Sequence, residues 1–374
     1  MMIKSFQIKN FRCFNSTKAS GFSMINLFGG RNNSGKTALL EALLLMGMPS
    51  NESIAKLLSF RRVSNKYLEK MPQKVWDNFF YQEKKENQIL LNFVLDNKSE
   101  NRVSIICEEK VDAFISMVNK DTDDEDVLAF ANSLVNTNIA KSSLNISAYT
   151  GETQLQINVF ISTSTGRVGK GIAHTFIDTH FVPASSKLNT EALATEFDIS
   201  KHEGNSEVLL KAFQIIDSTI EKVDTFNIGE AALYLKRNNE KYMPLSLFGD
   251  AMNRIADFLL RIVNNKNSIL LIDEIENGIH YENQEDIWKI LFELCKEHNV
   301  QLFATSHSYE MIEAFKNIII NNDFQEYAGY FEMARHPVSN EVTIQKIPIY
   351  SLEDKLNNKN PIRGEQRNSR RKVS

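Results

Sequence analysis

The chain has 374 residues, of which 42% are hydrophobic and 24% are charged, and its net charge is −4 at pH 7. This composition is that of an ordinary globular protein, and the length accommodates one large α/β domain with an insertion or two modest domains. The net negative charge argues against a protein that coats nucleic acid with its whole surface. We find no signal peptide, no apolar run long enough to span a bilayer and no metal or redox spacing among the three cysteines, so we expect a cytoplasmic protein.

The first predicted elements flank a glycine-containing loop. Residues 3–11 alternate in part between apolar and polar side chains, which predicts a strand. The mostly apolar residues 24–28 predict a buried strand, and residues 38–46 predict a buried helix that ends at Gly47. The intervening loop therefore lies at a strand-to-helix junction and faces the positive end of the helix.

Residues 30–37 read GRNNSGKT, which fits the phosphate-loop pattern of two glycines separated by four residues and followed by Lys and a hydroxyl residue. The backbone N–H groups of such a loop surround the β-phosphate of a nucleotide, while Lys36 reaches the β- and γ-phosphates and the Thr37 hydroxyl binds Mg²⁺. A glycine- and serine-rich surface turn can mimic the pattern, but the flanking strand and helix favour a nucleoside triphosphate site. The predicted nucleotide-binding residues here are Gly30, Asn32, Asn33, Ser34, Gly35, Lys36, Thr37 and Ala38.

The segment that follows the predicted helix carries no recognisable motif. Strands are predicted at residues 88–95, 102–107, 154–162 and 175–182, an acidic helical stretch at 108–134, and an amphipathic helix at 206–223. The acidic run 121–126 is a conceivable metal cluster, but it lacks the glycine and the distal Glu of a calcium loop. A solvated surface loop is the favoured reading of that run.

A second informative region begins near residue 244. The apolar face of residues 251–263 predicts a helix, and Ser246 and Gly249 come directly before it. Donors at the amino end of a helix form a second anion site, although an ordinary capped helix explains the same residues.

Two acidic residues end the next predicted strand, at residues 268–274. Ligands of parallel sheets lie at the carboxyl ends of the strands, so we expect Asp273 and Glu274 at the phosphate site. We predict that Asp273 holds Mg²⁺ through its water shell and that Glu274 orients and deprotonates the attacking water. The alternative is a pair of solvated turn residues, which the preceding aliphatic run and the phosphate loop disfavour.

The remaining residues complete a strand–helix–strand unit. Residues 281–297 predict a helix and residues 300–305 a strand, at whose end lies His307. A lone histidine is usually structural, but this position favours a functional role beside the γ-phosphate. Ser308 is the expected N-cap of a helix at 309–315. We also predict a hairpin or edge strands at 327–335 and 341–347. The polar, basic residues 357–374 are expected to form a mobile tail.

Five features in this order resemble the ABC-type ATPases of the RecF, SMC and OLD group. They are NFR at 10–12, the phosphate loop, Ser-x-x-Gly-Asp at 246–250, LIDEIENG at 271–278 and TSHS at 305–308. The features look most like the small OLD-like AAA ATPases of bacterial anti-phage systems, such as the ATPase of the Paris system. They cover residues 3–46 and 244–316, and the middle third and the tail carry no match.

The resemblance implies an α/β P-loop NTPase of the ABC type, with a mixed sheet, an antiparallel part at the N-terminus and an inserted lobe. It implies one ATPase head over residues 1–356, with core segments 1–48 and 225–350 and the insertion at about 49–224. The Toprim nuclease domain of the OLD nucleases is not expected, because the chain after the switch region is too short for it.

The resemblance also implies a head-to-tail dimer that closes on two molecules of ATP with Mg²⁺. Ser246 and Gly249 would meet the γ-phosphate held by the other subunit, His307 would be the switch histidine, and residues 276–278 would lie at the subunit contact. Relatives often have a glycine where this chain has Ala251, which bears on how tightly the trans contact closes.

Three functions follow from these observations. The first is an ATP-hydrolysing switch that scaffolds or controls a separately encoded effector, such as a Toprim or HNH nuclease, in anti-phage defence, and it depends on the resemblance. The second is a DNA-binding repair clamp of the RecF type, which the acid-free segment 1–40 and the basic tail favour. The third, a nucleotide-binding subunit of a transporter, lacks the LSGGQ signature and any membrane partner that the sequence indicates.

Overall fold

A mixed six-stranded sheet forms the centre of the computed structural model, which describes residues 1–61, 66, 70–108, 141–163, 167–171, 174–184 and 190–358. The strand order is β16-β15-β3-β14-β13-β9, and all neighbours are parallel except the hairpin of β15 and β16. The strands are β3 (Ile25–Gly30), β9 (Thr179–Val182), β13 (Ile269–Ile272), β14 (Gln301–Ser306), β15 (Ala328–Arg335) and β16 (Val342–Ile347).

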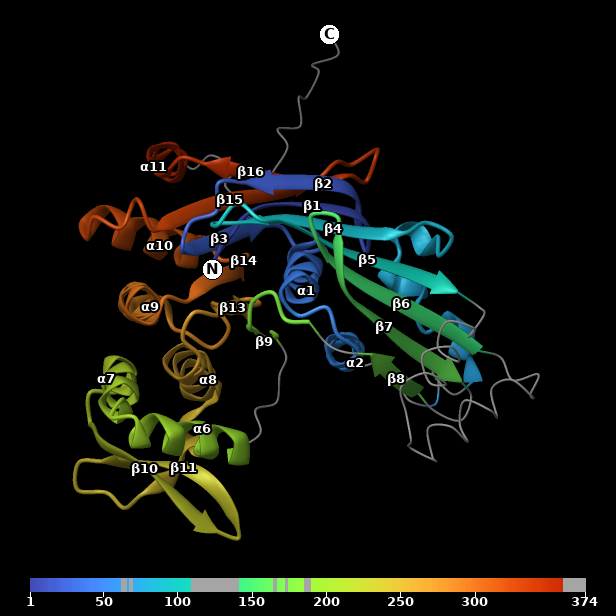
Figure 1. Cartoon of the computed structure of the whole chain (residues 1–374). Coiled ribbons are helices and arrows are strands. Elements are labelled where there is room, and N and C mark those ends of the chain that lie inside the picture. The colour runs from blue at the N-terminus through green and yellow to red at the C-terminus, as the bar shows by residue number, and fades with distance from the viewer. Residues whose placement is uncertain are drawn as a thin grey trace.

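Helices cover both faces of this sheet (Figure 1). Alternate residues of β13 show the two layers, because Ile269 and Leu271 pack in one hydrophobic cluster and Leu270 and Ile272 in the other. Such double burial explains why these strands read as continuous apolar runs in the sequence. The helices are α1 (Lys36–Gly47), α2 (Asn51–Phe60), α8 (Asp250–Asn264), α9 (Gln284–His298), α10 (Tyr309–Asn321) and α11 (Ile349–Asn357).

A seven-stranded antiparallel sheet lies on the other side of α1, so that α1 is enclosed between two sheets (Figure 1). Its order is β2-β1-β4-β5-β6-β7-β8, and its strands are β1 (Ile3–Phe11), β2 (Phe14–Ser20), β4 (Ile89–Leu95), β5 (Glu100–Glu108), β6 (Lys141–Thr150), β7 (Thr153–Thr163) and β8 (Arg167–Gly171). Three short 3₁₀ turns precede β4, namely η1 (Pro72–Lys74), η2 (Asp77–Phe79) and η3 (Tyr81–Glu83).

A smaller layer lies beyond α8, at the lower left of Figure 1. It contains a three-stranded sheet in the order β10-β11-β12, packed against two helices. The elements are α6 (Thr190–His202), α7 (Ser206–Ile216), β10 (Ile220–Ile228), β11 (Glu230–Arg237) and β12 (Met243–Pro244), followed by the 3₁₀ turn η4 (Leu245–Phe248). A further 3₁₀ turn, η5 (Tyr281–Asn283), precedes α9, and none of the described helices is long and apolar enough to cross a bilayer.

The predicted α/β class with a mixed sheet and an antiparallel part is confirmed. The helix predicted at 206–223 is too long, because α7 ends at Ile216 and the chain then enters β10, where cross-strand pairing replaces the helical pattern. The helix predicted at 309–315 is too short, since α10 continues to Asn321, and the strand predicted at 175–182 is confined to β9. The segment expected as an insertion supplies β4–β8 to the antiparallel sheet and β9 to the mixed sheet.

Some predictions cannot be compared with the structure. The acidic stretch from residue 109 onward, including 121–126, and the tail from residue 359 lie outside the described residues. Glu108, the first residue of the predicted acidic helix, ends β5 instead.

Candidate active site

The phosphate loop connects β3 to α1, and both of its glycines are required by close packing. A Cβ on Gly30 would lie 2.5 Å from Ser34 Oγ and 3.0 Å from the carbonyl oxygen of Met333. Gly35 has a φ of 98°, and a Cβ there would lie 2.8 Å from Cys13 Sγ. Gly35 is also the N-cap of α1, which has no side-chain cap and no acidic residue in its first turn. The amino end of α1 therefore offers its backbone N–H groups to an anion.

Lys36 lies at the mouth of this loop with only 7% of its surface exposed. Its ammonium donates hydrogen bonds to the carbonyl oxygens of Gly30 at 2.8 Å and Arg31 at 3.0 Å. These carbonyls are neutral acceptors, and phosphate oxygens are stronger acceptors for an ammonium group. The arrangement keeps the charge of Lys36 inside the loop, where a nucleotide's phosphates are expected.

Asp273, which follows β13, links the phosphate loop to β14. Thr37 Oγ1 donates to Asp273 Oδ2 at 2.8 Å, and Thr305 Oγ1, near the end of β14, donates to Asp273 Oδ1 at 2.6 Å. Burial raises the pKa of Asp273, while the hydrogen bonds from Thr305 and Thr37 act in the opposite direction. A hydroxyl and a carboxylate this close are oxygen donors of the kind that Mg²⁺ prefers, so these two residues fit the predicted metal site.

Glu274 follows directly and faces the same cavity. Its φ of 48° is uncommon for a residue other than glycine. The Glu274 N–H donates to Thr305 Oγ1 at 2.9 Å, and Asn277 Nδ2 donates to Glu274 Oε2 at 2.9 Å. The side chain is therefore held in one orientation at the carboxyl edge of the parallel strands.

His307 lies just beyond β14, beside the loop that follows Asp273 and Glu274. Its Nδ1 is 2.8 Å from Glu276 Oε1, and the same carboxylate oxygen accepts the backbone N–H groups of His307 at 2.7 Å and Ser308 at 3.2 Å. His307 is not among the described residues that line the cavity. The predicted N-cap Ser308 is confirmed, since its side chain accepts from the Met311 N–H.

Ser246 and Gly249 lie away from the phosphate loop of their own chain. Both are exposed on η4 and at the start of α8, and they are not among the described residues that line the cavity. Gly249 has a φ of 89° and is the N-cap of α8, which has no side-chain cap. Within one chain, then, this predicted pair does not join the other site residues.

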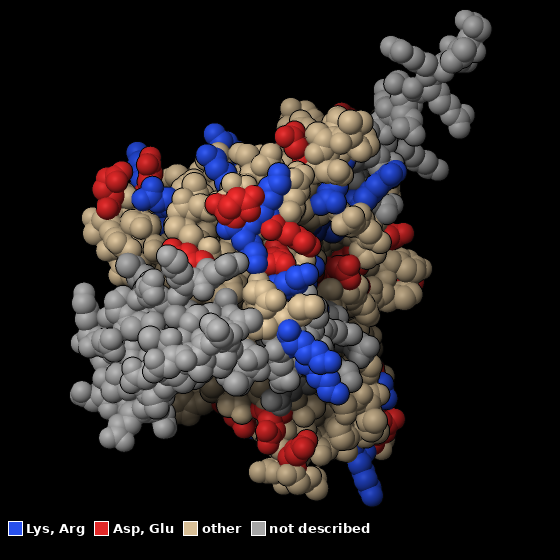
Figure 2. Space-filling view, turned by 90° about the vertical axis from the view of Figure 1, so that its right-hand side faces the viewer, with Lys and Arg blue, Asp and Glu red and all other residues tan. Residues whose placement is uncertain are grey.

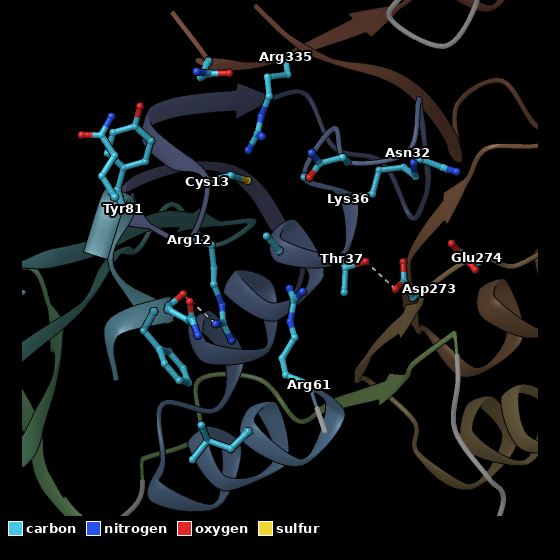
Figure 3. A pocket seen from close by; sticks show the side chains of 18 of the residues that line it. Arg12, Cys13, Asn32, Lys36, Thr37, Arg61, Tyr81, Asp273, Glu274 and Arg335 are labelled. Carbon is cyan, nitrogen blue, oxygen red and sulfur yellow. Dashed lines mark hydrogen bonds between the residues drawn. The ribbon is translucent and has the colours of Figure 1, made fainter. Parts of the chain in front are cut away.

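The cavity measures about 800 Å³ and extends from the phosphate loop to a second wall that the sequence patterns did not assign to the site. Figure 3 shows Asp273 and Glu274 on one side and Tyr81 on the opposite side. Arg335 and Cys13 also line the cavity, and burial raises the pKa of the Cys13 thiol. These residues come from β15, η3 and the turn between β1 and β2, which are distant in the sequence.

Two further arginines line the cavity and share one buried carboxylate. Glu41, on α1, is fully buried and accepts from Arg12 Nε at 2.9 Å and from Arg61 Nε at 2.7 Å. Arg12 also lies over the Phe79 ring at 4.2 Å, and burial lowers its pKa. The hydrogen bond to Glu41 raises the pKa of Arg61. The sequence analysis did not identify this cluster, although a single carboxylate inside an otherwise apolar predicted helix is a signal that could have indicated it.

Comparisons with known proteins show the family of the chain. A family model described as "AAA domain, putative AbiEii toxin, Type IV TA system" matches residues 25–313. A Helicobacter pylori (strain ATCC 700392 / 26695) protein named "ATP/GTP phosphatase" is 26% identical over 353 residues, which cover 88% of this chain and 92% of that protein.

Two solved structures are distant likenesses. The SMC head domain from Thermotoga maritima is 11% identical with a TM-score of 0.39, over 93% of this chain and 99% of that one. The SmcHead bound to the C-winged helix domain of ScpA is 10% identical with a TM-score of 0.47, over 96% of this chain and all (100%) of that one. The matched family region spans well over half of the chain and contains the phosphate loop, Asp273, Glu274 and His307. The chain therefore belongs to this family of AAA domains and is an ATPase.

Proposed function

We propose that the protein binds ATP with Mg²⁺ in the cavity, hydrolyses the γ-phosphate, and acts as a dimeric switch for a separate effector. The observation that carries the catalytic part is the hydrogen-bonded series of Thr37, Asp273 and Thr305. This series brings the phosphate loop, β13 and β14 to one edge of the parallel sheet, where ligands of such sheets bind.

Each residue of the loop has a defined task in this proposal. The backbone N–H groups from Asn32 to Ala38 surround the phosphates, and the Lys36 ammonium moves from its two carbonyl partners to the β- and γ-phosphate oxygens. Thr37 and Asp273 would hold Mg²⁺. The ion would neutralise charge on the phosphates when bound.

Glu274 is the proposed general base. Its carboxylate lines the cavity, and the hydrogen bond from Asn277 fixes one of its oxygens. A carboxylate held at this edge orients the attacking water and accepts its proton. His307, which Glu276 holds at the end of the adjacent strand, is the proposed sensor of the γ-phosphate.

The opposite end of the cavity is the proposed site of the nucleotide base. Tyr81 offers a ring and Arg335 a guanidinium, and both lie where the cavity extends away from Asp273 and Glu274 (Figure 3). Aromatic rings and guanidinium planes both stack on nucleotide bases. The cavity would then hold a whole nucleoside triphosphate, with its phosphates at the loop and its base at η3.

The proposed second subunit supplies Ser246 and Gly249 to the ATP of the first. In support, Leu247 is 70% exposed between them, and Tyr281 on η5 is 61% exposed. A Cβ on Gly278 would lie 3.1 Å from the backbone N of Ala251, so the loop at 276–278 packs against the start of α8. The predicted signature and the predicted contact loop thus share one surface, and exposed apolar side chains on it favour a partner.

The effector and its biological setting are the finer part of the proposal. The family description names a putative toxin of a type IV toxin–antitoxin system, and the sequence motifs resemble OLD-like ATPases of anti-phage systems. The resemblance favours a cytoplasmic defence switch whose effector, such as a Toprim or HNH nuclease, is a separate chain. Co-purification of that chain in the presence of ATP would support this part of the proposal.

A RecF-like DNA clamp is the second candidate, and the basic residues Lys4 and Lys18 on β1 and β2 favour it. On the face shown in Figure 2, however, the Lys and Arg side chains are interspersed with Asp and Glu rather than gathered in one basic strip. DNA affinity that falls steeply with salt concentration in the presence of ATP would support the clamp. Nucleic acid thus remains a candidate partner in this second proposal.

Mixing two inactive variants tests the shared site. Lys36→Ala should lose ATP binding, because it removes the charge inside the loop. Ser246→Arg should lose turnover, because a large cation on η4 prevents closure over the other subunit's ATP. In a heterodimer of the two, one site has an intact Lys36 and an intact Ser246 from the other chain, so mixing should restore part of the ATPase activity.

Subunit exchange is first confirmed with two different affinity tags. A Ser246→Arg protein that is fully active by itself would show that η4 plays no part in the trans site. If folded Lys36→Ala binds ATP with wild-type affinity in calorimetry, the assignment of the phosphate loop as the nucleotide site is wrong.

A further inference from the structure

Arg254 is a buried cation that the proposed mechanism does not use. It lies on α8, five positions after the N-cap Gly249, and only 7% of its surface is exposed. It is not among the described residues that line the cavity. Burial lowers the pKa of Arg254, and the nearby carboxylates of Asp257 and Asp273 act in the opposite direction. Burial of an arginine is costly in free energy, because the guanidinium loses its hydration, and it requires compensating hydrogen bonds or ion pairs.

The guanidinium donates to four backbone carbonyls from two strand ends. Nη2 lies 3.0 Å from the Asp273 oxygen and 3.2 Å from the Glu274 oxygen. Nη1 lies 3.2 Å from the oxygens of both Pro183 and Ala184, just beyond β9. The planar fork of an arginine is suited to this pattern, whereas a lysine is a compact charge on a flexible stem.

These four carbonyls lie where regular strand pairing ends. The last bond between β9 and the residues after β13 runs from the Asp273 N–H to the Val182 oxygen at 3.0 Å. Directly after this bond, Glu274 adopts its left-handed backbone with a φ of 48°. Such a conformation costs on the order of 1–3 kcal/mol and persists only where surrounding contacts hold it. Arg254 makes these contacts from the carbonyl side, while Thr305 binds the Glu274 N–H.

We infer that Arg254 is a positioning residue for ATP hydrolysis: it fixes the backbone of Asp273 and Glu274, so that the Glu274 carboxylate faces the attacking water. The inference rests on the proposed role of Glu274 as general base. Arg254 acts through the backbone of these two residues and is not itself among the described residues that line the cavity. Its loss should therefore lower kcat and leave the affinity for ATP nearly unchanged.

The substitution Arg254→Lys keeps the charge and removes the fork. Misplacement of a catalytic group by about 1 Å can lower a rate about a hundredfold, so we expect kcat to fall about tenfold to a hundredfold, with less than about a twofold change in KM. The matched control is Arg261→Lys on the same helix, where the side chain binds Asp257 at 2.7 Å and not the residues after β13. The control should retain the wild-type kcat.

A double-mutant cycle separates positioning from general damage. If Arg254 acts through Glu274, adding Arg254→Lys to Glu274→Gln should lower the residual rate by less than about twofold. An equal loss in both backgrounds would overturn the inference and leave Arg254 as a structural residue. Should Glu274→Gln itself retain wild-type turnover, the proposed base would be wrong, and the inference would fall with it.

Folding of each variant is checked by its thermal midpoint. Where Arg254→Lys does not fold, Arg254→Gln supplies a neutral amide donor and enters the same cycle. A wild-type kcat in either folded variant would contradict the inference, and a selective loss of kcat that disappears in the Glu274→Gln background would support it.

Discussion

The two walls of the cavity are built in different ways, although they enclose the same space. The wall at the phosphate loop consists of the loop between β3 and α1 and of the two residues that follow β13, with β14 behind them. The opposite wall consists of the turn between β1 and β2, the 3₁₀ turn η3 and the end of β15. Cys13 and Tyr81 reach the cavity from the side of the antiparallel sheet, which lies over α1 (Figure 1), whereas Arg335 ends β15, the parallel neighbour of β3.

The first wall therefore carries out phosphate transfer in this proposal, whereas the second wall binds the rest of the nucleotide. Phosphate transfer requires a fixed set of groups close to the strand ends, so it is encoded in short stretches of sequence. The second wall requires only a ring, a cation or a polar group at the right place in space. We therefore expect damage to the first wall to affect kcat, and damage to the second to affect KM or stability.

The largest effect is expected from Glu274→Gln in the first wall. The amide cannot accept a proton, so kcat should fall by roughly 10²–10⁴-fold if Glu274 is the general base. ATP affinity should remain near that of the wild type, because Lys36 and the loop are unchanged. Steady-state ATPase assays and calorimetry measure the two quantities. The trapped species should be a dimer by light scattering, and unchanged turnover would show that Glu274 is not the base.

The first wall could be predicted from the sequence because its signals are local. An apolar strand, a glycine-bounded loop and a helix fix where Lys36 and Thr37 lie, and the end of a buried strand fixes Asp273 and Glu274. The series from Thr37 to Asp273 to Thr305 then follows from parallel neighbours in the sheet.

The second wall could not be predicted in the same way. Tyr81 lies in a 3₁₀ turn without apolar periodicity. Arg335 ends β15, and the prediction of a hairpin or edge strands at 327–335 did not indicate that this strand lies beside β3. The buried role of Arg254 was hidden because one arginine on a helix reads as a solvated residue. Elements such as β2, β6, α2, α6, β10, β11 and α11 were also missed, since their short or polar patterns gave no clear period.

The second largest effect is expected at the junction of the two walls, from Glu41→Gln. Glu41 belongs to α1, whereas Arg12 comes from the turn between β1 and β2, so the substitution leaves Arg12 buried without its carboxylate. Removing one partner of a buried ion pair costs about 3–5 kcal/mol. We expect a value of about 3 kcal/mol, at the lower end, because the Arg61 side chain is 43% exposed.

Denaturant unfolding measures this loss. The control is Glu52→Gln, which breaks an exposed pair with Lys56 and should change the free energy of unfolding by less than about 0.5 kcal/mol. Equal stability of the Glu41 and Glu52 variants would show that α1 and the antiparallel sheet are not joined energetically by this cluster.

A smaller effect is expected within the second wall, from Tyr81→Ala. Stacking of a base on an aromatic ring contributes about 1–3 kcal/mol, so KM for ATP should rise about tenfold while kcat changes little. Tyr81→Phe keeps the ring and should remain within about twofold of the wild type. An unchanged KM in Tyr81→Ala would place the base elsewhere in the cavity and weaken the division between the walls.

The smallest effect is expected far from both walls, at His298. This residue ends α9, which leads into the amino end of β14, the edge of the sheet opposite to the phosphate loop. It is 5% exposed, and burial lowers its pKa from the ordinary value of 6.5. The unfolded chain therefore takes up a proton as the pH falls through 6.5, before the folded chain does. The contribution of His298 to stability should therefore decrease over this range as the solution becomes more acidic.

Denaturant midpoints at pH 7.5 and about 5.5 test this residue, and His298→Gln should reduce the difference between them. Asp178, Asp217 and Asp224 have lowered pKa values, and their stabilising effect is lost only as the pH falls below the ordinary value of 3.8, outside this window. The control is His202→Gln, at an exposed position, which should leave the difference between the two midpoints as in the wild type. ATP turnover of His298→Gln should follow the wild type at both pH values, because the residue lies at the edge away from the cavity. A changed KM or kcat would mean that the two edges of the sheet are coupled, and the separation of chemistry from scaffold would then be wrong.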